Sequence, residues 1–197
     1  AEDCAETFQF TREDQDEYAL TSLARAQAAQ KTNAFKNEIA TVFIETRKSS
    51  KEVIVDEQPG TARPDKIPKL KPAFREGGTV TAANSSSISD GAAALVLASE
   101  EMAIAKNLTI RGRILGHASH AQAPNIFTTA PVFAVLKLLR QLGWSKEDVD
   151  LWEVNEAFAV VPLAFMREVG ISHDIVNING GACALGHPVG ASGARIM

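Results

Sequence analysis

Apolar residues recur at helical spacing in four stretches of the chain. Alanines dominate residues 12–30, and apolar residues follow Pro131 at intervals of three or four until Gly143. Together with residues 100–107 and 157–169, these stretches are expected to form helices, because such spacing places the apolar side chains on one face. Thr11 followed by Asp14 predicts a capped helix start.

Shorter apolar runs, rich in β-branched residues, predict strands. They comprise residues 38–45, 53–55, 93–98, 110–118, 151–154 and 175–178. The run at 93–98 contains no charged residue and is expected to be buried. Strands that alternate with helices at these intervals indicate an α/β layered fold.

Residues 56–78 interrupt this pattern. Four of the eight prolines lie here, with five basic residues between Arg63 and Arg75. Proline fixes φ and removes an amide donor, so we expect an extended loop without helix. A loop of this length is too long for an ordinary connection, which favours a functional role.

Composition narrows the class of protein. The 197 residues are 45% hydrophobic and 22% charged, enough for a buried core in one or two domains. A net charge of −4 and a pI near 5.6 give no support for nucleic-acid binding. No apolar run approaches the roughly 18 residues of a membrane span. Two cysteines, Cys4 and Cys183, are too few for a disulfide framework and favour a reducing compartment.

Three clusters carry candidate chemistry. The first is the glycine-rich string GGACALGHPVGASG at residues 180–193, where glycines allow close backbone approach and positive φ. Taken alone, it could be a phosphate-binding loop or a tight turn. The second is NEAFA at residues 155–159, between a predicted strand and a predicted helix; Glu156 could there be only a favourable charge at a helix start. The third, GTVTAANSSSISDGA at residues 78–92, could be a serine-rich turn.

Together these clusters resemble the motifs of the thiolase family, in the family's order along the chain. The glycine string is similar to the thiolase signature GGA-x-A-x-GHP-x-G-x-SG, and Asn155 precedes His187 by 32 residues. The third cluster is similar to the segment that returns from the family's loop domain, with Ser85, Ser87 and Ser89 in place of the commoner Ala, Gly and Asn. The resemblance extends over essentially the whole chain, and FTTAP at residues 127–131 is similar to the biosynthetic subgroup.

The resemblance implies an acyltransferase that joins two acetyl-CoA molecules into acetoacetyl-CoA and CoA, or runs in reverse by thiolysis. His187 is then expected to help activate a nucleophilic cysteine and to donate to a thioester or enolate oxygen. Asn155 would hold a water molecule that completes this oxyanion hole, and Ala157 and Phe158 would line the channel. Coenzyme A is substrate and product, and no cofactor or metal is expected.

The coenzyme A contacts implied by the resemblance lie in the first half of the chain. Ser86 occupies the position of the serine that approaches the pantetheine arm. Arg63 and Lys66 are candidate contacts for the nucleotide phosphates, because cationic side chains screen such charge. Relatives often carry arginine soon after the Asp56–Glu57 pair, whereas Gly60 and Thr61 follow here, so the assignment of these two residues departs from the family pattern.

Neither cysteine matches a catalytic position of the family. The acylated cysteine is expected before residue 1 and the cysteine base after Met197, so we expect the chain to be a piece of a longer protein and to be inactive alone. It opens without methionine and stops in the first turns of a predicted helix. Cys183 fills a small apolar position, where a buried thiol packs as a hydrophobic group. The remaining histidines, His117, His120 and His173, match no catalytic motif.

The resemblance also implies the domain organisation. Residues 1–88 are expected to belong to the loop domain, 89–108 to complete the N-terminal core domain, and 109–197 to form most of the C-terminal core domain, all within the layered αβαβα thiolase fold. We further expect a homo-oligomer, a dimer or a tetramer, in the cytoplasm, with an organelle as the alternative. Fatty-acid metabolism is the expected setting.

Three other functions remain open at this point. One is a broader-chain 3-ketoacyl-CoA thiolase of fatty-acid degradation, which the motifs do not separate from the biosynthetic enzyme. Another is a non-catalytic lipid-binding relative, which would have no chemical need for both Asn155 and His187. The most distant is a ketoacyl synthase, which resembles the motif around Asn155 less well.

Overall fold

The computed structural model describes all of residues 1–197. The helices and strands, in chain order, are α1 (Glu2–Phe8), α2 (Arg12–Lys31), β1 (Val42–Glu45), β2 (Ser50–Val53), α3 (Glu57–Thr61), the 3-10 helix η1 (Pro64–Lys69), α4 (Glu100–Ala105), η2 (Pro124–Thr129), α5 (Ala130–Leu142), η3 (Lys146–Asp148), α6 (Val160–Val169), η4 (His173–Ile175), α7 (Ala182–Leu185) and α8 (Ser192–Arg195). None of the helices combines the length and the apolar composition needed to cross a membrane.

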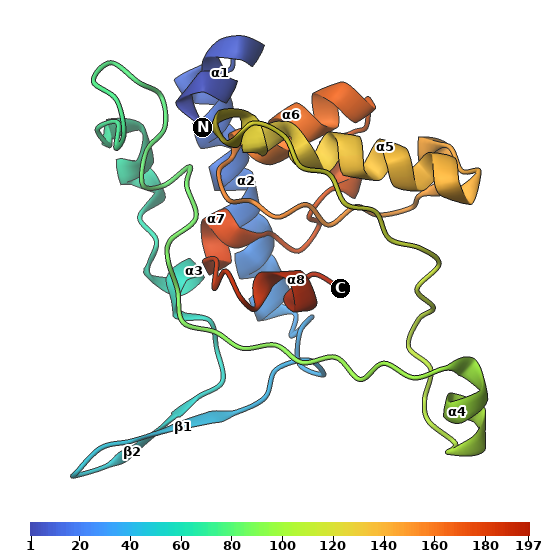
Figure 1. The fold of residues 1–197 in the computed structure, drawn as a ribbon. Coiled ribbons are helices and arrows are strands. Elements are labelled where there is room, and N and C mark those ends of the chain that lie inside the picture. The colour runs from blue at the N-terminus through green and yellow to red at the C-terminus, as the bar shows by residue number, and fades with distance from the viewer.

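Helix α2 forms the centre of the helical part of the molecule (Figure 1). Its start is the predicted capping box: Thr11 Oγ1 accepts from the Asp14 amide at 3.0 Å, and Asp14 Oδ2 accepts from the Thr11 amide at 2.8 Å. The buried face of α2 carries small residues such as Ser22 and Ala26. They let α7, α3 and α6 pack closely against the helix.

Helices α5 and α6 enclose the main hydrophobic core. Both begin with a proline in the first turn and end at a glycine with positive φ, Gly143 at 67° and Gly170 at 70°, as expected for Pro near a helix start and Gly just after its end. The core comprises Val132, Leu139, Trp152, Val154, Val161, Phe165, Val169 and Val176. It therefore joins the two helices to the segments around residues 152 and 176.

Strands β1 and β2 form an antiparallel hairpin that extends from the helical part (Figure 1). Val42 pairs with Val53 and Glu45 with Ser50. The first strand lies within the predicted run 38–45, whereas the second begins three residues before the predicted 53–55. The apolar side chains of β1 are exposed on this hairpin.

The strand predictions after residue 89 were mostly wrong for this structure. Residues 93–98 and 110–118 form no strand, and Val96 is 92% exposed. The runs 151–154 and 175–178 make a single parallel bridge, between Trp152 and Val176. A strand needs a neighbour for its backbone hydrogen bonds, and the apolar runs at 93–98 and 110–118 have none within residues 1–197. The layered sheets expected after residue 109 are accordingly not formed as hydrogen-bonded ladders here.

Residues 56–78 also differ from the prediction. The expected helix-free loop contains two short helices, α3 and η1. Pro64 begins η1 and Pro59 lies in the single turn of α3, where a proline costs no hydrogen bond because first-turn amides have no partner within the helix. The helix predictions elsewhere were confirmed, including α4 within 100–107 and α5, which begins at Ala130, one residue before Pro131, and ends at Leu142.

Candidate functional site

Three segments distant in the sequence meet at His187. The Ser86 amide and hydroxyl both donate to the Ala157 carbonyl, each at 3.0 Å. One residue further along this serine segment (residues 78–92), the Ser87 carbonyl accepts from the His187 amide at 3.0 Å. The serine segment therefore runs between the two motifs that carry Asn155 and His187, and backbone hydrogen bonds fix it to both.

The side chains of Asn155 and His187 are in direct contact. Asn155 Nδ2 lies 3.3 Å from His187 Nε2, and His187 Nδ1 lies 2.6 Å from Ser192 Oγ. Both residues are only partly buried, so the pair is accessible from solvent. The structure thus brings together the two residues that the resemblance singled out.

Two proton arrangements are open to the His187 ring. In one, Nδ1 donates to Ser192 Oγ, whose own proton goes to the Pro188 carbonyl at 3.2 Å, and Nε2 accepts from the Asn155 amide. In the other, the Ser192 hydroxyl leaves Pro188 and donates to Nδ1, so the Nε2–H and the Asn155 N–H lie side by side with no acceptor from this chain and can share one from a substrate. Only the second arrangement offers two donors to a developing oxyanion.

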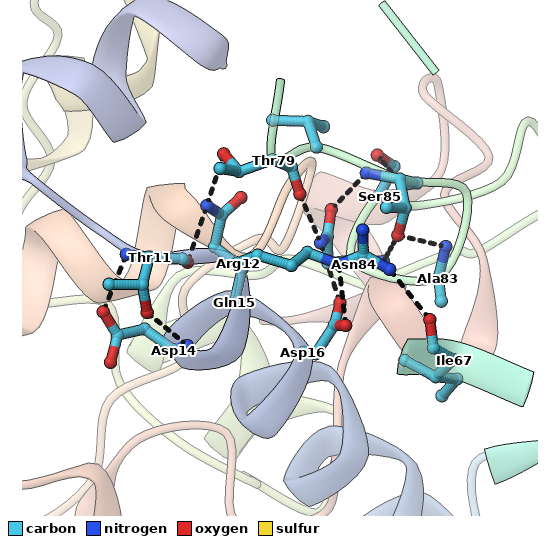
Figure 2. Close-up of polar contacts among 12 residues, drawn as sticks. Thr11, Arg12, Asp14, Gln15, Asp16, Ile67, Thr79, Ala83, Asn84 and Ser85 are labelled. Atoms are coloured by element: carbon cyan, nitrogen blue, oxygen red, sulfur yellow. Dashed lines mark hydrogen bonds and ion pairs between the residues drawn. The ribbon is translucent and has the colours of Figure 1, made fainter. Parts of the chain in front are cut away.

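A network around Asn84 anchors the start of the serine segment on α2 (Figure 2). The fully buried Asn84 donates to Asp16 Oδ1 at 3.0 Å and accepts from the Thr81 amide at 2.7 Å. Arg12 pairs with Asp16 at 2.7 Å and donates to the Ile67 carbonyl of η1 at 2.9 Å. One network therefore fixes α2, the basic loop (residues 56–78) and the serine segment relative to one another.

Glu156 is the polar residue at this site that the sequence did not single out beyond a charge at a helix start. Its carboxylate is fully buried and accepts four hydrogen bonds, from the Tyr18 hydroxyl at 2.8 Å, the Ser22 hydroxyl at 2.7 Å, Asn177 Nδ2 at 2.9 Å and the Cys183 amide at 3.0 Å. It forms no ion pair. No local pattern reveals these partners, because Tyr18 and Ser22 lie more than 130 residues away in the sequence.

Cys183 contacts Glu156 through both its backbone and its side chain. Its amide donates to the carboxylate, and its thiol lies 3.7 Å from the backbone carbonyl oxygen. Burial, together with the charge of Glu156, raises the pKa of Cys183 well above its usual value. A thiol held in its neutral form is a poor nucleophile, so the structure supports the packing role expected for Cys183.

Ala157 and Phe158 follow Glu156 and face the aromatic side of the site. The Phe158 ring meets Phe74 edge-on at 5.8 Å and Phe127 at 6.4 Å between centroids. Phe74 and Phe127 are exposed. These rings form an apolar wall that is open to solvent on one side.

Arg63 and Lys66 lie on the basic loop, at the start of η1 and inside it. Both side chains are exposed and neither enters an ion pair. No hydrogen bond connects either residue with Asn155 or His187. The structure leaves their charges free without bringing them to the His187 pair.

The other histidines lie outside the site. His173 stacks on Tyr18, with 4.7 Å between ring centroids, and burial and the nearby Arg25 lower its pKa. His117 and His120 are exposed. No group of three or more His, Cys, Asp and Glu side chains is arranged to hold a metal ion.

An open cavity of about 430 Å³ adjoins the His187 loop. Its walls come from the segment after the serine cluster and from the residues that follow His187: Ser89, Asp90, Gly91, Ala92, Ala93, Pro188, Val189, Gly190 and Ala191. The two walls touch closely at Gly91, where a Cβ atom would lie 2.6 Å from Pro188 Cγ.

Two family models match the chain, the thiolase N-terminal domain over residues 1–101 and the thiolase C-terminal domain over residues 108–197. Among curated relatives, acetyl-CoA acetyltransferase 2 of Arabidopsis thaliana is 50% identical over 200 residues, covering 100% of this chain and 50% of the relative. The mitochondrial acetyl-CoA acetyltransferase of Bos taurus is 48% identical, covering 100% of this chain and 47% of the relative. The chain spans about half the length of the curated relatives it matches.

Solved structures show the same fold. The acetyl-CoA acetyltransferase of Bacillus anthracis superposes with a TM-score of 0.96 at 42% identity, over 99% of this chain and 50% of that chain. The Acat5 thiolase of Ascaris suum in complex with coenzyme A gives 0.91 at 44%, over 98% and 49%. The human mitochondrial 3-ketoacyl-CoA thiolase gives 0.94 at 41%, over 99% and 50%. The extended segments after residue 89 thus follow the course of the thiolase fold without forming its ladders.

Proposed function

The chain belongs to the thiolase family, and on that premise we propose that its protein is an acetyl-CoA acetyltransferase. The reaction condenses two acetyl-CoA molecules to acetoacetyl-CoA and CoA, or cleaves acetoacetyl-CoA with CoA. The relatives that share 46–50% identity with this chain carry that name.

The observation that carries the proposal is the contact between Asn155 Nδ2 and His187 Nε2 at 3.3 Å. In condensation, a cysteine thiolate attacks one acetyl-CoA, CoA leaves, and an acetyl-cysteine thioester remains. A base then removes an α-proton from the second acetyl-CoA, and the resulting carbanion attacks the acetyl group and expels the thiolate. Negative charge develops on a thioester oxygen during these steps, where two convergent N–H donors stabilise it.

This chain would supply the oxyanion donors and much of the coenzyme A surface. Ser86 already donates its hydroxyl proton to Ala157, so its lone pairs remain to accept from an amide N–H of the pantetheine arm. The free cations Arg63 and Lys66 suit the nucleotide phosphates. The apolar wall of Phe158, Phe74 and Phe127 suits an acyl group, and the names of the relatives favour acetyl transfer over the broader-chain thiolase. We propose that both cysteines of the reaction come from outside residues 1–197.

The assembly and the compartment remain proposals as well. We keep the expectation of a homo-oligomer acting in fatty-acid metabolism. Relatives include proteins named as mitochondrial and others that are not, so family membership does not determine the compartment. The cytoplasm stays our expectation.

The proposal can be tested in a chimera in which residues 1–197 replace the matching half of the Bacillus anthracis enzyme. The chimera should cleave acetoacetyl-CoA. His187→Ala should lower its kcat about 100-fold or more and leave coenzyme A binding nearly unchanged, because the histidine acts on charge that exists only in the transition state. A chimera that folds and binds coenzyme A but has no thiolysis activity would refute the assignment.

The isolated chain provides the complementary test. Residues 1–197 alone should show no thiolysis, because Cys4 packs in an apolar cluster and the Cys183 thiol contacts the Glu156 backbone carbonyl, while the His187 ring contacts Asn155 and Ser192. The loss of acetoacetyl-CoA absorbance should therefore match a blank. Turnover that disappears in Cys183→Ser would instead identify Cys183 as the nucleophile.

A further inference from the structure

The buried carboxylate of Glu156 has contacts on both sides of the Asn155–His187 pair. On one side it is the next residue after Asn155. On the other it accepts from the Cys183 amide at 3.0 Å, four residues before His187. Its placement therefore affects the backbone positions of both partners.

The support for this carboxylate comes from helix α2. Tyr18 and Ser22 are one helical turn apart, and they donate to opposite oxygens of Glu156, Oε1 and Oε2. Ser22 Oγ also accepts from the Gly181 amide at 3.0 Å. The Ser22 hydroxyl thus joins the carboxylate and the glycine-rich loop in one chain of hydrogen bonds.

The two glycines of the loop make this approach possible. A Cβ atom on Gly181 would lie 2.3 Å from the Glu156 carboxylate carbon, and one on Gly180 would lie 2.5 Å from the Ser22 carbonyl oxygen. Gly180 also has a positive φ of 78°. The loop before His187 is therefore in tight contact with Glu156 and α2.

No cation pairs with the Glu156 carboxylate, although the site proposed above has to stabilise a further negative charge on a thioester oxygen. A buried carboxylate held only by neutral donors is costly unless its geometry is fixed. Four donors from α2, the segment at Asn177 and the glycine-rich loop meet that requirement.

We propose that Glu156 is a positioning residue, whose carboxylate uses Tyr18 and Ser22 on α2 to hold Asn155 and the His187 loop at the spacing that the oxyanion requires. The proposal rests on the function proposed above. The carboxylate makes no contact with the reacting atoms and acts through Asn155 and His187.

The tautomer of His187 depends on the hydrogen bonds that its two ring nitrogens make with Asn155 and Ser192, so it responds when these groups move apart. In residues 1–197, the ¹⁵N shifts of the ring nitrogens at a pH above about 8, where imidazole is neutral, give the ratio of the two tautomers. The resonances are assigned with His187→Ala. Because no turnover is measured, an inactive chimera would refute the proposed function and leave this test intact.

Two substitutions preserve the charge of Glu156. Tyr18→Phe removes the hydrogen bond to Oε1 and makes no direct contact with the glycine-rich loop, so it is the more decisive. Ser22→Ala removes the hydrogen bond to Oε2 and also the one that Ser22 Oγ accepts from the Gly181 amide. We expect Ser22→Ala to shift the His187 tautomer ratio toward that of free imidazole, and Tyr18→Phe to shift it in the same direction. Glu156→Gln should have the larger effect, since its amide group would face at least one N–H, that of Asn177 or Cys183, which can only donate.

The controls separate positioning from loss of stability. Val132→Ala removes core volume on α5 and should leave the His187 ratio unchanged, and the exposed His117 and His120 should not respond to any variant. If Ser22→Ala and Tyr18→Phe both fold and leave the His187 ratio unchanged, the proposal is wrong. The same conclusion follows if Val132→Ala shifts the ratio as much as they do. If Glu156→Gln fails to fold, Ser22→Ala and Tyr18→Phe still test the positioning role of Glu156.

Discussion

Two apolar segments of this chain, residues 93–98 and residues 160–169, differ in secondary structure and in burial. The second forms α6, with Val161 and Phe165 in the main core. The first forms no regular structure, and Val96 and Leu97 are largely exposed. Both segments are apolar enough to be buried, so hydrophobicity does not explain the difference.

The difference lies in where each backbone finds its hydrogen bonds. A helix satisfies its own amides and carbonyls and needs only one packing surface, which α5 and the segment at Trp152 provide for α6. An extended segment depends on neighbouring strands. The hairpin of β1 and β2 shows the intermediate case, because its strands pair with each other and still expose their apolar side chains.

Hydrogen exchange should show the largest contrast. In residues 1–197, we expect the amides of 93–98 and 110–118 to exchange at rates close to those of an unfolded chain. Those inside α6 and the middle of α2 should be slower by about three orders of magnitude or more, since their exchange requires opening of the packed core. Mass spectrometry of labelled peptides measures this. Comparable protection of 93–98 would show that the segment finds a partner strand, for instance in a second copy of the chain.

Truncation of one side chain in each of these two segments should show a smaller contrast, in the free energy of unfolding. Phe165→Ala should lower the free energy of unfolding by about 3–5 kcal/mol, because it leaves a cavity beside Trp152. Leu97→Ala should change it by less than about 0.5 kcal/mol, as expected for an exposed side chain. Urea unfolding followed by circular dichroism measures both values. A large loss in Leu97→Ala would contradict the exposed position of that segment.

The same contrast decides what the sequence could predict. Helices with their own start and stop signals, such as Thr11 with Asp14 for α2 and Gly143 for α5, were predicted correctly because those signals are local. The strands at 93–98 and 110–118 were predicted from composition alone. Neither segment makes ladder hydrogen bonds with a neighbouring segment in the structure, and composition does not reveal whether such a neighbour is present.

The candidate site likewise contains residues that the sequence predicted and residues that it did not. Motifs pointed to Asn155 and His187, and the structure brings these two side chains into contact. The network of Glu156 could not be predicted, because its donors on α2 have no sequence pattern that relates them to residue 156. The positions of Arg63 and Lys66 relative to a bound nucleotide stay a prediction.

The cap of α2 should give the smallest of these effects, and it also concerns the helix on which the site is built. Thr11→Ala removes the hydroxyl that accepts from the Asp14 amide and should cost about 1 kcal/mol of unfolding free energy at neutral pH.

The hydrogen bonds from the Thr11 amide and hydroxyl lower the pKa of Asp14 below its usual 3.8. A carboxyl with a depressed folded pKa contributes stability above its unfolded pKa, and that contribution is lost as the pH falls through the folded value. Asp14→Asn should therefore destabilise the chain at neutral pH, and the difference from wild type should shrink below about pH 4.

Asp148 caps η3 in the same manner and also has a lowered pKa, so Asp148→Asn is the matched control. Because η3 is three residues long and contributes no buried side chain, its variant should have the smaller effect in urea titrations at neutral and acidic pH. Equal effects of the two variants would show that the α2 cap adds nothing beyond a local hydrogen bond.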